Sequence, residues 1–70
     1  MDWIDTPESS NILRFRYDTD RQVLTVVFKD DSTYDYFDVP EGVFDAMRAA
    51  PSKGKFLAAQ VKGRYRYERR

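Results

Sequence analysis

The first half of the chain alternates apolar and polar residues over three short segments. Residues 11–17 and 33–37 show this alternation, and residues 23–28 form a continuous run rich in β-branched side chains. A period of two is typical of half-buried strands, and β-branched residues favour extended structure. Because only short, Asp-rich turn segments connect the three, we expect a three-stranded antiparallel meander.

The second half shows helical spacing. Residues 41–50 carry one apolar stripe, formed by Val43, Phe44, Met47 and Ala50. Pro51 ends this helix, and Ser52 is a suitable N-cap for a second helix over residues 53–61. These elements predict an α+β fold of order βββαα, with both helices on one face of the sheet and an extended C-terminal tail.

The chain is short enough to be one domain. Its 70 residues leave no room for a second core, and five Phe, five Tyr and one Trp supply the large side chains that a small core needs. We expect Phe28 and Phe44 in that core. Within the single domain 1–70, residues 1–8 form an N-terminal arm, residues 9–67 the core and residues 68–70 a basic end.

Charge is divided along the chain although the net charge is zero. Residues 1–50 carry five basic and eleven acidic residues, a net charge of −6, whereas residues 51–70 carry seven basic residues and one acidic residue, a net charge of +6. An acidic body with a basic tail often contacts a polyanion. The same pattern also fits a tail that neutralises its own body, and the sequence leaves both interpretations open.

Composition excludes most catalytic chemistry. The chain has neither cysteine nor histidine, so disulfides, thiol or imidazole nucleophiles and zinc clusters are absent. Its paired aspartates lie in turn segments and lack the calcium-loop pattern. We therefore expect no enzyme activity, metal site, cofactor or small-molecule substrate. No apolar run could span a membrane, and the first residues resemble no signal peptide, so a cytoplasmic location is expected.

The C-terminal segment is the strongest candidate for binding. In an extended chain, the basic residues of 62–67 point to one side and its two tyrosines to the other, a pattern suited to phosphates and stacked bases of a single strand. The alternative is a solvated terminus whose tyrosines pack on the body. Together with basic residues elsewhere, the candidate nucleic-acid-binding residues are Lys53, Lys55, Lys62, Arg64, Tyr65, Arg66, Tyr67, Arg14 and Arg16.

Two sets of residues on the predicted sheet have competing interpretations. Tyr34 and Tyr36 share one face, where they could stack on bases or, as we favour, pack in the core. The opposite, outer face would carry an apolar patch made of Ile12, Val23, Val27 and Phe37. Exposed apolar area tends to mark an interface, so the arm, the tail, a second subunit or a nucleic acid is expected to cover this patch.

Several short motifs occur together in an order that resembles the KTSC domain family. They are Ser9-Ser10-Asn11-Ile12, Tyr17-Asp18, Leu24-x-Val26-x-Phe28, Tyr34-x-Tyr36, Val39-Pro40 and Ala50-x-Ser52-x-Gly54-x-Phe56, followed by Val61 and Lys62. The chain departs from the family pattern at Arg16 and Asp31, where the family often has glycine, and near Ala58, where it often has asparagine.

The KTSC module takes its name from the C-terminus of some lysyl-tRNA synthetases and also occurs as a free-standing bacterial protein. The resemblance implies a role that is biochemically undefined, with RNA binding suggested by the synthetase fusion. Our hypothesis is a small non-catalytic module that binds nucleic acid, with RNA or another single strand as partner. The alternative is a protein-interaction or homodimerisation domain that uses the outer sheet face.

Overall fold

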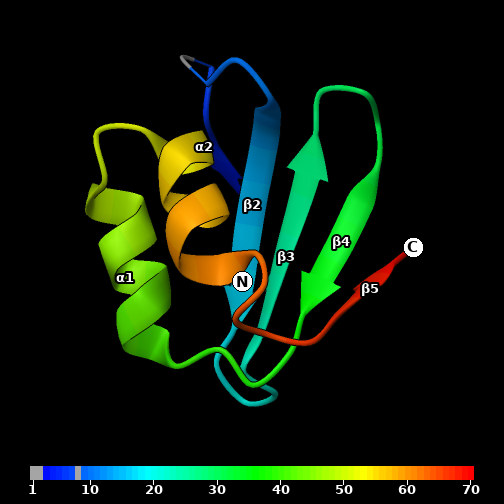
Figure 1. Ribbon diagram of the computed structural model, residues 1–70, viewed down its shortest axis with the longest axis vertical. Coiled ribbons are helices and arrows are strands. Elements are labelled where there is room, and N and C mark those ends of the chain that lie inside the picture. Colours follow the sequence, from blue (N-terminus) through cyan, green and yellow to red (C-terminus); the bar gives the residue numbers. More distant parts are fainter. Residues whose placement is uncertain (1–2, 8) are drawn as a thin grey trace.

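The computed structural model describes residues 3–7 and 9–70 and shows one sheet with helices on a single face (Figure 1). The elements in chain order are β1 (Ile4–Asp5), β2 (Ile12–Asp18), β3 (Val23–Phe28), β4 (Thr33–Tyr36), α1 (Glu41–Ala49), α2 (Lys53–Phe56), the π-helical turn η1 (Leu57–Val61) and β5 (Tyr67–Arg69). Within these residues, no helix combines the length and apolar character needed to cross a bilayer.

The sheet is antiparallel and has five strands in the order β1-β2-β3-β4-β5, so the predicted three-stranded meander is wrong. The arm and the tail each add an edge strand: Ile4 pairs with Phe15, and Tyr67 pairs with Tyr36. Both additions satisfy backbone groups that the outer edges of β2 and β4 would otherwise leave unpaired. The α+β class is confirmed. Residues 1, 2 and 8 of the predicted arm lie outside the described residues.

A β-bulge changes which residues of β2 face the core. Ile12 pairs with Phe28, but Arg14 pairs with Val27, so Leu13 is an extra residue between the two pairs. An extra residue reverses the alternation on one side of the bulge. Ile12 is therefore fully buried on the helix-covered face, and Leu13 is 42% exposed. The prediction that Ile12 lies on the outer face is wrong for this reason.

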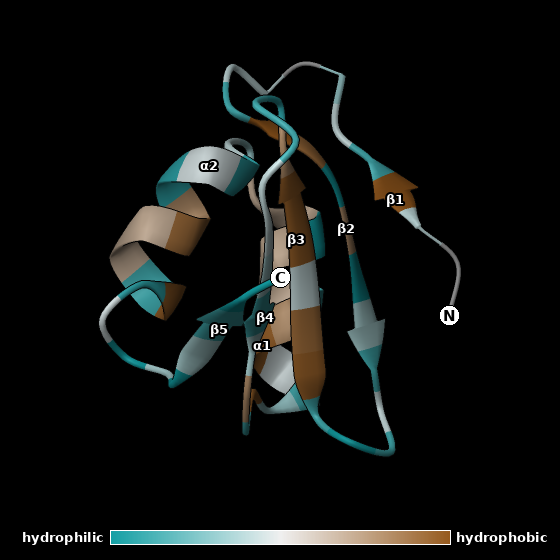
Figure 2. Cartoon of the chain, turned by 90° about the vertical axis from the view of Figure 1, so that its right-hand side faces the viewer, coloured by the Kyte–Doolittle hydropathy of each residue, from teal (hydrophilic) through white to brown (hydrophobic). Residues whose placement is uncertain are grey.

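The core fills the space between the sheet and the helices. Phe44 of α1 packs edge-on against Phe15 and stacks on Tyr17, with ring centroids 5.8 and 5.0 Å away. The Tyr17 hydroxyl donates a hydrogen bond to the carbonyl oxygen of Val39, just before α1. Figure 2 shows that apolar residues dominate β3, in the middle of the sheet, whereas β5 is mostly hydrophilic. The sheet is thus buried at its centre and more polar toward its β5 edge.

The helices begin where the sequence indicates. Pro40 precedes α1, and the Ser52 hydroxyl accepts a hydrogen bond from the backbone N–H of Lys55 at 3.3 Å, which caps α2. The predicted second helix over residues 53–61 is α-helical only over its first four residues and continues as η1. This wider turn ends with the N–H of Lys62 bonded to the carbonyl of Leu57 at 2.8 Å.

Candidate nucleic-acid interface

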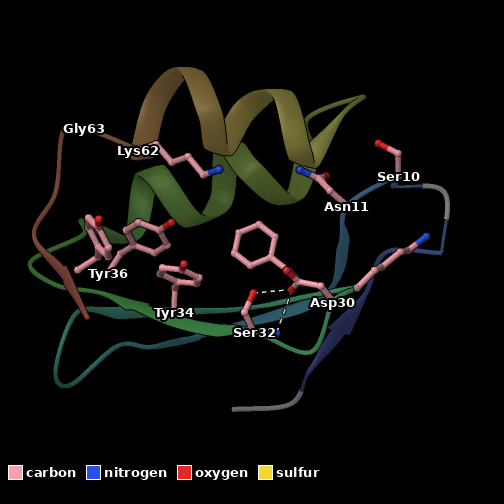
Figure 3. Close-up of a pocket in the computed structure, with 11 residues that line it drawn as sticks. Ser10, Asn11, Asp30, Ser32, Tyr34, Tyr36, Lys62 and Gly63 are labelled. Carbon is pink, nitrogen blue, oxygen red and sulfur yellow. Dashed lines mark hydrogen bonds between the residues drawn. The ribbon is translucent and has the colours of Figure 1, made fainter. Parts of the chain in front are cut away.

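An open pocket of about 790 Å³ lies between the β3–β4–β5 part of the sheet and the end of the helical segment (Figure 3). We call it the aromatic pocket. It is lined by Ser10, Asn11, Phe28, Lys29, Asp30, Ser32, Tyr34, Tyr36, Lys62, Gly63 and Tyr67. Its volume falls within the range typical of small-ligand sites, about 300 to 1,000 Å³.

Four aromatic rings form one wall of this pocket. Tyr34 lies 5.5 Å from Phe28, 6.4 Å from Tyr36 and 5.7 Å from Tyr67, measured between ring centroids. Pairing across β4 and β5 places Tyr36 and Tyr67 side by side on the helix-covered face, with centroids 5.8 Å apart. Tyr36 is buried, but Tyr67 is 55% exposed, so the wall reaches the surface. A planar ligand could stack there.

Burial also changes the pKa of one tyrosine in this wall, Tyr36. It raises the pKa of Tyr36 to about 12, and the neighbouring phenols of Tyr34 and Tyr67 add to the effect. Tyr36 is therefore a neutral phenol at physiological pH.

Two cationic side chains lie against these rings. The Lys62 ammonium lies 5.4 Å from the Phe28 ring centroid, and the Arg69 guanidinium lies 6.0 Å from that of Tyr34. Both distances are within the range of cation–π contacts. Figure 3 shows the Lys62 side chain reaching from the end of the helical segment into the pocket. Positive charge therefore accompanies the aromatic wall.

The opposite end of the pocket is polar. Asp30 Oδ1 accepts hydrogen bonds from the backbone N–H and the hydroxyl of Ser32, at 3.0 and 2.6 Å. These hydrogen bonds, and the charge of Arg69, lower the pKa of the Asp30 carboxyl, which is therefore an anion. Within the described residues, no cluster of three or more carboxylates could hold a metal ion.

Local backbone conformation brings these residues together. In the β3–β4 turn, Asp31 adopts a left-handed conformation with φ of 70°, which aspartate tolerates better than most residues. The family's glycine is therefore not required there. Gly63, with φ of 80°, turns the chain away from η1 immediately after Lys62. The backbone N–H of Lys29 donates to the carbonyl of Asn11 at 2.8 Å and joins the turn to the segment before β2.

The structure divides the predicted nucleic-acid-binding residues between two faces. Lys62 and Tyr67 line the aromatic pocket, together with the family-motif residues Tyr34 and Tyr36. Tyr36 is a core residue as predicted, but Tyr34 is only partly buried and contributes to the open wall. The predicted structural pair therefore also forms part of the candidate site.

Lys53 and Lys55 lie close to this pocket. They line a second hollow of about 390 Å³ that shares Ser10 and Asn11 with the aromatic pocket. The Lys53 ammonium donates a hydrogen bond to the carbonyl of Ala50 at 2.9 Å, whereas Lys55 is exposed. The two hollows form neighbouring parts of one surface, on which both lysines could meet the same ligand.

The remaining arginines lie elsewhere. Arg14 and Arg16 are on the outer face, where their guanidinium carbons lie 4.7 and 4.6 Å from the ring centroid of Trp3. Arg66 is also there, 5.0 Å from the ring of Phe37. Arg64 is exposed in the turn after Gly63. The sequence predicts a uniformly extended tail. In the structure the tail is a turn followed by a short strand, because the chain must bend after η1 so that β5 can pair with β4.

Tyr65 has a different role from Tyr67. It is half-buried and packs against the hydrophobic core. Its backbone N–H bonds to the carbonyl of Val61 at 3.3 Å, within the turn that follows η1. Tyr65 therefore anchors the turn, and its exposed surface is small compared with that of Tyr67.

The apolar patch predicted on the outer face is smaller than expected. Ile12 is absent from it and Val27 is only 9% exposed, which leaves Val23 and Phe37 half-buried. A polar network crosses this face beside them, in which Asp35 accepts from Thr25 at 2.7 Å and from Arg70 at 2.8 Å. The predicted homodimer through this face stays a prediction that now rests on Val23, Val27 and Phe37.

Sequence reasoning missed seven of the residues that line the pocket, and it also missed Arg69, which lies over Tyr34. The seven are Ser10, Asn11, Phe28, Lys29, Asp30, Ser32 and Gly63. Phe28 shares the alternation that places Tyr34 inward, and Arg69 continues the two-residue spacing of the tail. Those two could have been found from the pattern. The contribution of Asp30 depends on the shape of a turn, which no spacing in the sequence predicts.

The fold and the pocket define a small α+β module, in which a five-stranded antiparallel sheet carries a helical segment on one face. The family model of the KTSC domain matches residues 8–65. A KTSC domain protein of known crystal structure, from Yersinia pestis, superposes with a TM-score of 0.92 and 32% sequence identity, covering 99% of this chain and 96% of that one. The chain belongs to the KTSC domain family.

Curated relatives are of two kinds. A protein from Tsukamurella paurometabola is 44% identical over 59 residues, which cover 84% of this chain and 88% of that protein. Lysine–tRNA ligases from Trichormus variabilis and Nostoc punctiforme are 42% and 40% identical over 62 residues, 89% of this chain. The match spans only 11% of the length of these ligases.

Proposed function

We propose that this chain is a small non-catalytic module that binds single-stranded nucleic acid, with RNA as the polymer, in the aromatic pocket. The observation that carries the proposal is the combination of an open aromatic wall, Phe28, Tyr34 and Tyr67, with the Lys62 ammonium that reaches over it. Aromatic rings that stack bases and cations that meet phosphates are the two components of single-strand binding sites.

The shape of the surface supports a strand more than a duplex. A base must leave its helical stack to lie flat on Tyr34 and Tyr67, which single strands allow at low cost. From the pocket, the strand would continue past Asn11 toward Lys53 and Lys55, which line the adjoining hollow. Their ammonium groups are suited to the next phosphates along the strand.

The relatives favour RNA as the polymer. The lysine–tRNA ligases that contain a matching segment act, by name, on a transfer RNA. A module carried within such an enzyme is placed to meet RNA, and an aromatic surface with flanking lysines is a means of holding it. The absence of cysteine and histidine from the chain supports a binding role rather than a catalytic one.

The test is a fluorescence-anisotropy titration of a labelled single-stranded RNA, repeated at two salt concentrations. Affinity should fall as salt rises, because phosphate contacts release counterions. Tyr67→Ala should weaken binding about tenfold or more at both concentrations, since loss of one stacking contact costs roughly 1 to 3 kcal/mol. Lys62→Gln should weaken binding mainly at low salt.

Two matched variants serve as controls. Leu13→Ala removes an exposed apolar side chain, 42% exposed, outside the pocket. Arg21→Gln removes one positive charge from the β2–β3 turn, which also lies outside it. Each should bind like wild type. No salt-dependent binding by wild type, or equal losses in pocket and control variants, would refute the proposal.

A further inference from the structure

We propose that Asp30 selects RNA over DNA by accepting a hydrogen bond from a ribose 2′-hydroxyl in the aromatic pocket. The inference rests on the proposed function and adds the part of the nucleotide that the polar end of the pocket recognises. The 2′-hydroxyl is the donor that distinguishes RNA from DNA at a given contact.

The hydrogen bonds of Asp30 leave one oxygen available. Oδ1 accepts both hydrogen bonds from Ser32, whereas Oδ2 has no hydrogen-bond partner within the described residues. Ser32 thus holds the carboxylate in one orientation, and Figure 3 shows Asp30 and Ser32 together at the end of the pocket away from Tyr36. An ionised carboxylate is an acceptor only, so Oδ2 can bind an O–H or N–H donor but not a phosphate.

The order of residues along the pocket matches the order of groups in a nucleotide. Tyr34 belongs to the stacking wall, Asp30 lies beyond it on the far side of Ser32, and Lys29 precedes Asp30 in the same turn. In a nucleotide the ribose lies between the base and the phosphate. With the base on Tyr34 and a phosphate near Lys29, the sugar falls at Asp30.

Neighbouring positive charges offset the repulsion between the Asp30 carboxylate and the phosphates of a nucleic acid. Lys29 and Lys62 line the same pocket, and Arg69 is near enough for its charge to help keep Asp30 ionised. These three positive charges outnumber the one negative charge. The pocket can therefore attract the phosphates of a strand and still offer one anionic acceptor to the sugar.

The experiment compares three oligonucleotides of about ten residues that differ only at the 2′ position: uridine, 2′-deoxyuridine and 2′-O-methyluridine. Because the base is the same in all three, a difference in affinity reports on the sugar. The methylated sugar keeps the oxygen but loses the donor hydrogen. Wild type should bind the uridine oligomer about tenfold more tightly than either of the others, the usual effect of one hydrogen bond to a charged group.

Asp30→Asn tests the carboxylate itself. The amide oxygen can still accept both Ser32 hydrogen bonds, while the free oxygen is replaced by an NH₂ donor. This variant should bind the uridine and 2′-O-methyluridine oligomers within about twofold of each other, because its NH₂ group can donate to either oxygen. Asp31→Asn is the matched control. It makes the same charge change in the same turn, outside the pocket, and should keep the wild-type preference.

The outcomes separate this inference from the proposed function. Salt-dependent binding of all three oligomers with equal affinity would overturn the role of Asp30 and leave nucleic-acid binding intact. A preference for uridine over 2′-O-methyluridine that persists in Asp30→Asn would assign sugar recognition to another group and also overturn it. If wild type binds none of the oligomers, both proposals fall.

Discussion

The side-chain oxygen of Asn11 lies 2.5 Å from the position that a Cβ atom would occupy on Gly54. The two residues belong to motifs more than forty positions apart in the sequence, and the fold brings them together beside the aromatic pocket. Real Cβ atoms do not approach another atom so closely. Glycine at this position therefore allows the segment before β2 to pack directly on the start of α2.

Gly54→Ala should destabilise the protein although alanine is the better helix former. The gain in helix propensity is at most about 1 kcal/mol. The new methyl group must displace Asn11, whose side-chain oxygen accepts a hydrogen bond from Ser9 at 3.2 Å, and overpacking of this kind costs about 1 to 3 kcal/mol. We expect a net loss of about 1 kcal/mol in the free energy of unfolding, measured by urea denaturation.

Two further variants identify the cause of that loss. Gly42→Ala is the matched control, because Gly42 also lies in the first turn of a helix but has open space around its would-be Cβ. It should raise stability slightly. In an Asn11→Ala background, Gly54→Ala should no longer destabilise, which would give a coupling of about 1 kcal/mol or more. Additive effects would show that the contact with Asn11 is not responsible.

Phe44 and Phe28 should differ in their contribution to stability. Phe44 is 5% exposed and contacts the rings of both Phe15 and Tyr17, so truncation to alanine should cost about 3 to 5 kcal/mol, the usual loss for a buried aromatic. Phe28 is only partly buried and lines the pocket. Phe28→Ala should cost clearly less in thermal unfolding. Equal losses would mean that the two rings are equally buried in solution.

Alkaline pH should destabilise the protein through Tyr36. Its pKa is raised to about 12 in the folded state, from an ordinary value of 10.0, because burial disfavours the phenolate. The resulting stabilisation is fully present below pH 10 and is lost as pH rises from about 10 to about 12, since the unfolded chain ionises first. Urea denaturation at a series of pH values across this range should show the loss.

Tyr36→Phe isolates this contribution. The variant keeps the ring but has no group to ionise, so it should lose less stability than wild type between about pH 10 and 12. Other tyrosines and the lysines remain in both proteins, and their titration cancels in the comparison. Parallel losses in the two proteins would contradict the assignment to Tyr36.

The sequence predicts the central part of this fold because its signals there are local. Alternation defines β2 and β4, and Pro40 and Ser52 mark the starts of the helices. The edge strands are less well predicted. β1 has only two residues and no alternation, and the alternation of the tail predicts an extended segment but not its pairing with β4 as the three-residue strand β5.

The β-bulge at Leu13 and the aromatic pocket both depend on features of the fold that the residue pattern does not predict. Ile12 and Leu13 are both large apolar residues, so the alternation of apolar and polar residues does not show which of them faces the core. The β-bulge, in which Leu13 is the extra residue, decides it. The aromatic pocket likewise depends on β5, which brings Tyr67 beside Tyr36. Sequence analysis identified the aromatic and basic residue types that a binding site needs. It could not assign Lys62 and Arg66 to different regions of the surface, because that separation arises from the turn at Gly63.

Neighbouring arginines of the tail offer a direct test of which face binds a nucleic acid. Arg69 lies over Tyr34 on the pocket side of the sheet, whereas Arg66 lies over Phe37 on the outer side. Arg69→Gln and Arg66→Gln make the same change in charge only three positions apart. If the RNA binds in the aromatic pocket, the two variants should bind it with different affinities although their net charges are identical.

Arg69→Gln should weaken RNA binding at low salt and reduce the slope of log K against log salt by about 0.7, the amount expected for one lost phosphate contact on a single strand. Arg66→Gln should leave that slope unchanged. Melting temperatures close to wild type are the control, because Arg66 and Arg69 both lie on or beside β5, whose loss would expose the tyrosine wall. The reverse result, a reduced slope for Arg66→Gln alone, would place the strand on the outer face, where Arg14 and Arg16 flank Trp3.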